Sequence, residues 1–157
     1  MADCTPRESI HSKAAIKGHP LHPMLIHFPV AALVAVVFTD LAYLWTVDEF
    51  WSRASVWLLG VGAVGGITAS VFGLVDLLWV SKIRQKVTAW CHAILAVMML
   101  SLASLNWMLR VVGLGPAETE FFWGLYLSVL TALLISVAAY LGGRLVYEHA
   151  VGVDLSN

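Results

Sequence analysis

The chain has 157 residues, of which 60% are hydrophobic and only 12% are charged; the mean hydropathy is +0.84 and the net charge −1. A soluble domain averages roughly 45–50% apolar and about 25% charged residues, so this composition predicts an integral membrane protein of one domain. The basic residues are too few and too scattered to follow a phosphate backbone, which excludes nucleic acid as a partner.

In chain order, a polar tail at 1–17 precedes a membrane domain at 18–153. Four apolar stretches are each long enough, at about 1.5 Å per residue, to cross a hydrocarbon core of about 30 Å. Short connections between consecutive spans indicate antiparallel neighbours. The sequence therefore predicts an all-α, up-down bundle of four transmembrane helices at about 24–45, 54–80, 87–111 and 121–146.

The basic residues predict the orientation of this bundle. Seven of them fall on the side that holds both termini and the central loop, and two fall on the other side. Cytoplasmic loops carry the excess of lysine and arginine, so both termini are expected in the cytoplasm. The seven are Arg7, Lys13, Lys17, Lys82, Arg84, Lys86 and Arg144, and the two are Arg53 and Arg110.

Histidines gather at the cytoplasmic ends of the spans. The segment GHPLHPMLIHFP places His22 and His27 where the first span opens, after His19 in the tail; His92 lies in the third span and His149 follows the fourth. A buried imidazole needs a polar partner and can bind a metal. The sequence therefore predicts a site at this depth of the membrane.

Two helix faces extend along the spans from the predicted site. Small or polar residues recur at helical spacing in the third span (His92, Ala96, Met99, Ala103, Asn106, Arg110) and in the second (Gly62, Gly66, Ala69, Gly73, Asp76). One interpretation is close helix packing. The other is a slot for a flat macrocycle beside Gly66 and Gly73, with His27 and His92 as axial ligands of a haem b iron and Asp76 tuning its potential.

Four motifs carry a resemblance to a known family. GHPLHPMLIHFPVA, GLVDLL, AWCHAIL and YLGGRLVYEHAVGV make residues 17–153 similar to the DUF2231 family of predicted four-helix bacterial membrane proteins. The resemblance implies a multi-pass protein of the bacterial inner membrane. It also implies electron transfer, because relatives are joined to or encoded near redox modules. It marks His19, His22, His27, His92 and His149 as the motif histidines.

Three function classes follow. The first is an electron-transfer protein with haem b on His27 and His92, working with a quinone and a separate redox partner. The second is a zinc or copper site for transport or sensing, with ligands among His19, His22, His27, His92 and His149. The third is a structural subunit of a larger complex or a homo-oligomer.

Stand-alone enzymatic activity is not predicted. No serine or cysteine nucleophile is paired with a base in a recognisable arrangement, so the sequence offers no catalytic residue. Asp76 is expected either to be protonated or to accept a hydrogen bond from an imidazole, from Arg144 or from a water chain. One role for it is to orient a histidine or to tie helices together; the other is to take up a proton when a nearby centre is reduced.

Overall fold

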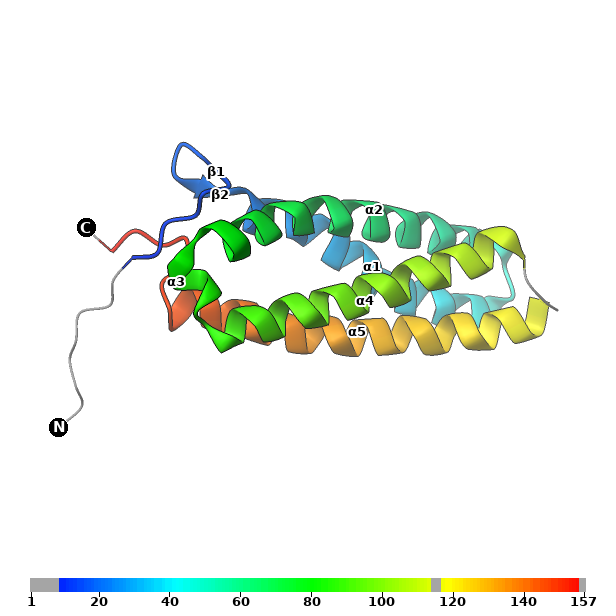
Figure 1. The fold of residues 1–157 in the computed structure, drawn as a ribbon. Helices are drawn as coiled ribbons and strands as arrows, with labels where there is room; N and C mark the ends of the chain where they lie inside the picture. Colours follow the sequence, from blue (N-terminus) through cyan, green and yellow to red (C-terminus); the bar gives the residue numbers. More distant parts are fainter. Residues whose placement is uncertain (1–8, 114–116, 156–157) are drawn as a thin grey trace.

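The computed structural model of the chain describes residues 9–113 and 117–155. For residues 117–121 it describes the backbone, and for the other residues it describes the side chains as well. Four long helices run side by side along the whole molecule (Figure 1). They are α1 (Leu21–Thr46), α2 (Glu49–Trp79), α4 (Val87–Val112) and α5 (Ala117–Tyr147), and all four have the length and composition of membrane spans. The predicted all-α bundle of four membrane helices is confirmed.

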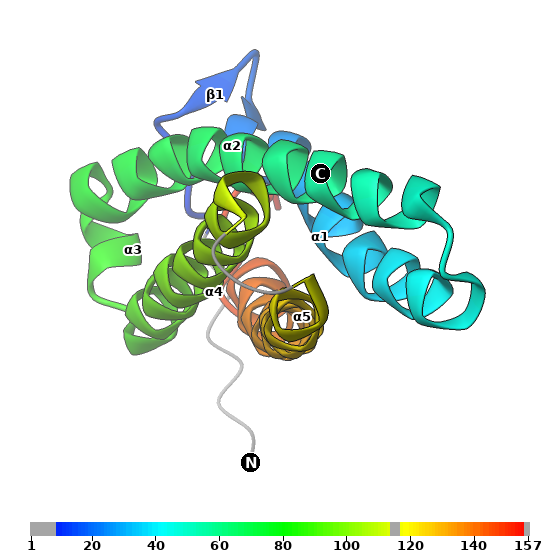
Figure 2. The same ribbon diagram turned by 90° about the vertical axis from the view of Figure 1, so that its right-hand side faces the viewer.

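Consecutive helices are neighbours, as the short connections predicted. The closest pairs are α1 with α2 and α4 with α5, and these two hairpins pack on each other through α2 with α4 and α1 with α5. Figure 2 shows α5 nearly end-on, whereas α2 runs across the view and α1 is seen obliquely beneath it. Residues 9–20 and 148–155 lie at the same end of the bundle (Figure 1), and this is the end where α1 and α4 start with His22 and His92 near their first turns.

Helix boundaries differ from the hydropathy estimate where capping decides them. α2 begins at Glu49, five residues before the predicted start, because the Asp48 side chain accepts a hydrogen bond from the N–H of Phe50 at 2.9 Å. The residues that cap the C-terminal ends of α1 and α4, Val47 and Gly113, both lie in the left-handed region with φ of 54° and 67°. The loop predicted after α2 contains a short helix, α3 (Ser81–Arg84).

Residues 9–20 have more structure than the predicted polar tail. Strands β1 (Ala15–Ile16) and β2 (His19–Pro20) form an antiparallel hairpin, turned by Lys17 and Gly18 at φ of 50° and 82°. Ile10 forms a parallel bridge with Val151 and is buried. Residues 1–8 lie outside the described residues.

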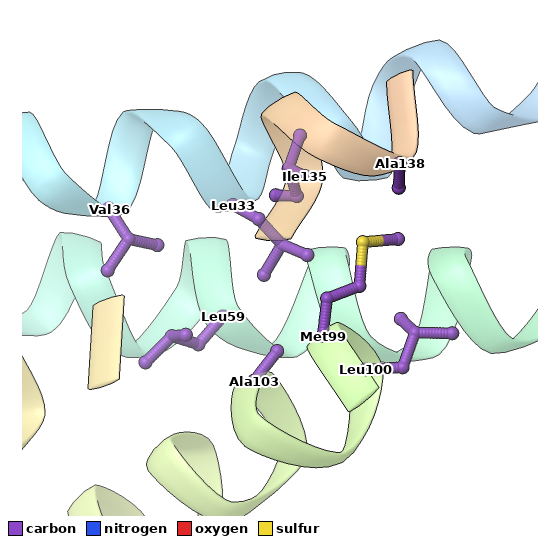
Figure 3. Close-up of a cluster of buried hydrophobic side chains, with 8 residues drawn as sticks. All are labelled: Leu33, Val36, Leu59, Met99, Leu100, Ala103, Ile135 and Ala138. Carbon is purple, nitrogen blue, oxygen red and sulfur yellow. The ribbon is translucent and has the colours of Figure 1, made fainter. Parts of the chain in front are cut away.

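The bundle core is a cluster of apolar side chains from all four long helices (Figure 3). Leu33 and Val36 from α1 meet Leu59 from α2 and side chains from the second hairpin, while large side chains such as Trp45 face outward. Lipid tails are as apolar as leucine, so close packing rather than transfer from water stabilises this core. The rest of the cluster is Met99, Leu100, Ala103, Ile135 and Ala138.

Candidate histidine site

Two imidazoles meet inside the histidine end of the bundle. His22 is the second residue of α1 and His92 the sixth of α4, and their ring centroids lie 6.1 Å apart with an interplanar angle of 86°. Nδ1 of His22 lies 2.8 Å from the carbonyl oxygen of Ala69, and Nδ1 of His92 lies 2.8 Å from that of Ala138. A carbonyl can only accept, so each Nδ1 carries the proton and, in the neutral ring, each Nε2 keeps its lone pair.

Each imidazole also packs against a glycine one turn beyond its carbonyl partner. A Cβ at Gly73 would lie 3.0 Å from Nδ1 of His22, and a Cβ at Gly142 would lie 3.3 Å from Cε1 of His92. Larger residues at these positions would displace the rings. The sequence separates histidine from carbonyl by 47 residues in the first hairpin and by 46 in the second. The two hairpins thus hold their histidines in the same way.

The other motif histidines lie elsewhere. His27 is on the exposed face of α1, so the structure brings His22 rather than His27 to His92. His19 is exposed in β2 and its Nδ1 approaches the Lys17 carbonyl oxygen, and His149 is half-buried beyond α5. Among residues 9–113 and 117–155, no three histidine, cysteine or acidic side chains form a group that could hold a metal ion. Cofactor or metal ligation by any of these histidines stays a prediction.

The glycine face of α2 is filled by the protein's own side chains. A Cβ at Gly66 would collide with Cδ2 of Leu100, and one at Gly62 with Leu33. Gly73 faces the His22 ring. These contacts are those of close helix packing, and they leave the positions beside Gly66 and Gly73 occupied by Leu100 and His22.

Asp76 has different partners from those expected. Its carboxylate accepts hydrogen bonds from the Ser12 hydroxyl at 2.6 Å and from the backbone N–H groups of Lys13 and Ala14 at 2.8 and 3.0 Å. Arg144, one of the expected partners, instead pairs with Glu148 at 2.7 Å. Asp76 therefore binds the segment that precedes β1, and the expectation of an imidazole or arginine partner is wrong.

A second polar cluster lies at the opposite end of the bundle, and the sequence reading missed it. Asp40 of α1 is fully buried, and both its oxygens accept from the Arg110 guanidinium at 2.7 Å. Ser55 of α2 and Ser128 of α5 donate to the same carboxylate at 2.7 and 2.8 Å, and Asn106 accepts from Nε of Arg110. All four long helices contribute to this cluster, which holds the two hairpins together.

The two polar clusters share a spacing. Asp40 and Arg110 are 70 residues apart, and so are His22 and His92. Both pairs join the first helix of one hairpin to the first helix of the other. The two hairpins therefore place equivalent positions against each other, once at each end of the bundle.

Comparison with known proteins agrees with this membrane fold. The model of one family, described as predicted membrane protein (DUF2231), matches residues 18–155. The chain belongs to the DUF2231 family. No curated protein and no solved structure matches it. The family assignment thus confirms a membrane protein, and the DUF2231 description carries no activity or ligand.

The histidine site offers one type of chemistry. Two neutral imidazoles with Nδ1 fixed by carbonyls present two Nε2 lone pairs, which are ligands for iron, copper or zinc. Hydrogen bonding at Nδ1 fixes the tautomer and the orientation of the ring. The clustered arginine and aspartate at the other end already satisfy each other, so the histidine pair is the candidate functional site of this DUF2231 protein.

Proposed function

We propose that the chain is a small electron-transfer protein of the bacterial cytoplasmic membrane that binds haem b through His22 and His92. The observation that carries the proposal is the matched pair of imidazoles, each tied through Nδ1 to a carbonyl of the neighbouring helix. The ring centroids of His22 and His92 lie 6.1 Å apart with the rings nearly perpendicular. A haem iron bound at this site would take one Nε2 atom from each ring as its protein ligands.

The number of ligands favours haem over zinc. A structural zinc site takes four protein ligands and a catalytic one takes three. Haem iron needs only two axial ligands from the protein, because the macrocycle supplies the rest. In the part of the chain that the structure describes, the histidine pair has no third histidine, cysteine or acidic side chain grouped with it to hold a metal ion.

The residues around the pair have defined roles in this proposal. The carbonyls of Ala69 and Ala138 fix the orientation of the rings, and Gly73 and Gly142 make room for them. A bound haem b would supply one-electron chemistry. The site lies within membrane helices, so a quinone in the bilayer and a separate redox protein are the proposed partners, with both termini in the cytoplasm.

The test is an absorption spectrum of the purified protein, oxidised and then reduced. We expect Soret and α bands of a low-spin, six-coordinate haem, because two imidazoles occupy both axial positions. Alanine at His22 or at His92 should remove or convert the spectrum. His27→Ala is the matched control, since this histidine lies on the same helix but faces outward. A spectrum lost in His27→Ala and kept in His22→Ala would contradict the proposed ligands.

Two other outcomes point to the alternative functions. A colourless protein with stoichiometric zinc or copper, reduced by the same two alanine substitutions, would mean a metal-ion site for transport or sensing. A protein with neither haem nor metal, even after haem is supplied during expression, would leave the role of a structural subunit. Either result refutes the proposed haem binding.

A further inference from the structure

The rings of His22 and His92 are held alike, but their backbones are not, because the two residues stand at different places in their helices. His92 lies inside α4, where the helix itself fixes its backbone. His22 is the second residue of α1, and the first four N–H groups of a helix have no partner within the helix. The position of the His22 ring therefore depends on the residues that precede α1.

Asp76 fixes those residues. Its carboxylate binds the backbone N–H groups of Lys13 and Ala14, and the carbonyl of Ala14 accepts from the N–H of Leu21 at 2.8 Å. Leu21 opens α1 and is the neighbour of His22. Three hydrogen bonds thus lead from the Asp76 carboxylate to the first residue of the helix that carries the imidazole.

The same face of α2 holds both the ring and the backbone of this histidine. Ala69, Gly73 and Asp76 follow one another at helical spacing. The first accepts from the His22 ring, the second packs against it, and the third binds the segment before it. We propose that Asp76 is a positioning residue for the His22 imidazole, acting through residues 12–14.

The second hairpin supports this assignment by contrast. Ala138 and Gly142 of α5 hold the His92 ring as Ala69 and Gly73 hold His22, but the position that corresponds to Asp76 is Leu145. Leu145 packs in an apolar cluster. Of the two hairpins, the one with the carboxylate is the one whose histidine stands at the start of a helix. At that position the helix does not hold the histidine backbone, so another group has to bind the residues before it.

The segment that Asp76 binds also covers this end of the bundle. Ile10 is buried with Leu77 and Ile83, its N–H donates to Ala150 at 3.1 Å, and its carbonyl accepts from Gly152 at 2.8 Å. Residues 9–20, called the cap from here on, lie at the end of the bundle where α1 starts with Leu21 and His22 (Figure 1). Loss of the Asp76 anchor is expected to open the cap next to His22 first.

The test compares the reactivity of the two histidines toward diethyl pyrocarbonate, read by mass spectrometry on the full chain in detergent. This inference rests on the proposed function, in which His22 is a haem ligand. The labelling needs no bound cofactor, so its result is independent of the absorption spectrum that tests haem binding. In Asp76→Leu we expect labelling of His22 to rise roughly tenfold relative to His92, since several hydrogen bonds to one buried carboxylate are lost.

Two further variants keep the test decisive. Asp76→Asn retains an oxygen for the two backbone N–H groups and should label nearly as the wild type does. Ser12→Ala removes only the hydroxyl bond and should give a small selective rise, even if Asp76→Leu does not fold. Equal rises at His22 and His92, or no change at His22 despite a lower melting temperature, would overturn the positioning role.

Discussion

The ion pair between Asp40 and Arg110 should make a large and asymmetric contribution to stability. Arg110→Met leaves the Asp40 carboxylate fully buried with only two hydroxyl donors. Removing one partner of a buried pair costs about 3–5 kcal/mol. Asp40→Leu should cost less, about 1–3 kcal/mol, because Arg110 lies in the last turn of α4 with 10% of its side chain exposed and can extend toward the headgroups.

The double variant provides the decisive comparison. With both charges replaced by apolar side chains, no buried charge is left unpaired, and we expect a stability within about 1–2 kcal/mol of the wild type. The assay is reversible unfolding of the four proteins of the cycle in mixed micelles, followed by circular dichroism. Glu148→Gln is the control: its pair with Arg144 is exposed, so the change should stay within about 0.5 kcal/mol.

Additivity would refute this reasoning. If the double variant loses the sum of the two single losses of stability, or if both single variants lie within about 1 kcal/mol of the wild type, the ion pair does not stabilise the contact between the hairpins.

Exchanging the two charges, by Asp40→Arg with Arg110→Asp, tests the geometry of the cluster. Gly124 gives Arg110 its space, since a Cβ there would lie 2.6 Å from Nη2, whereas Ser55 donates to Asp40. The reversed pair should therefore fold well only together with Ser55→Gly and Gly124→Ser.

Three further substitutions, two of them with a neighbouring glycine as control, test the packing. Gly66→Ala should destabilise by about 1–3 kcal/mol in the same unfolding assay, because its Cβ meets a leucine of α4, whereas Gly65→Ala makes an ordinary contact and should be neutral or stabilising. Thr131→Val should raise stability by about 1 kcal/mol, since among the described residues its buried hydroxyl has no hydrogen-bond partner; a loss would mean that the hydroxyl has one. Gly142→Leu should disturb the histidine pair in the absorption spectrum or the labelling experiment, and Gly143→Leu should not, because a Cβ at Gly143 meets only the edge of a tyrosine.

The membrane fold could be predicted from sequence because span length and hydropathy are properties of consecutive residues. The histidine pairing depends on helix rotation instead. His22 and His27 are five residues apart, which turns them roughly 140° around the helix, and both have apolar neighbours. Which of them faces His92 follows only from how α1 packs on α2 and α4.

The sequence contains a signal for the Asp40 cluster. Asp40 is the sole charged residue between Lys17 and Asp48. A lone acidic residue in a membrane span indicates a partner inside the bundle, and Arg110, near the corresponding end of its own span, is the matching charge. The cap could not be predicted, for another reason. Strands of two residues are too short to show an alternating hydrophobic pattern in the sequence. Asp76 binds backbone N–H groups, and because nearly every residue has one, the sequence does not indicate which of them it binds.

The two polar clusters have a common structural origin. The first helix of one hairpin packs near the first helix of the other, so residues at equivalent positions of the two hairpins meet. His22 meets His92 in this way, and Asp40 meets Arg110. At the histidine end the residues are alike, and two imidazoles lie side by side. At the other end they differ in charge and the pair neutralises itself, with Asp40 and Arg110 sharing two hydrogen bonds. The apolar core lies between these two ends, so the ion pair that joins the hairpins is separated from the histidine pair by the length of the core.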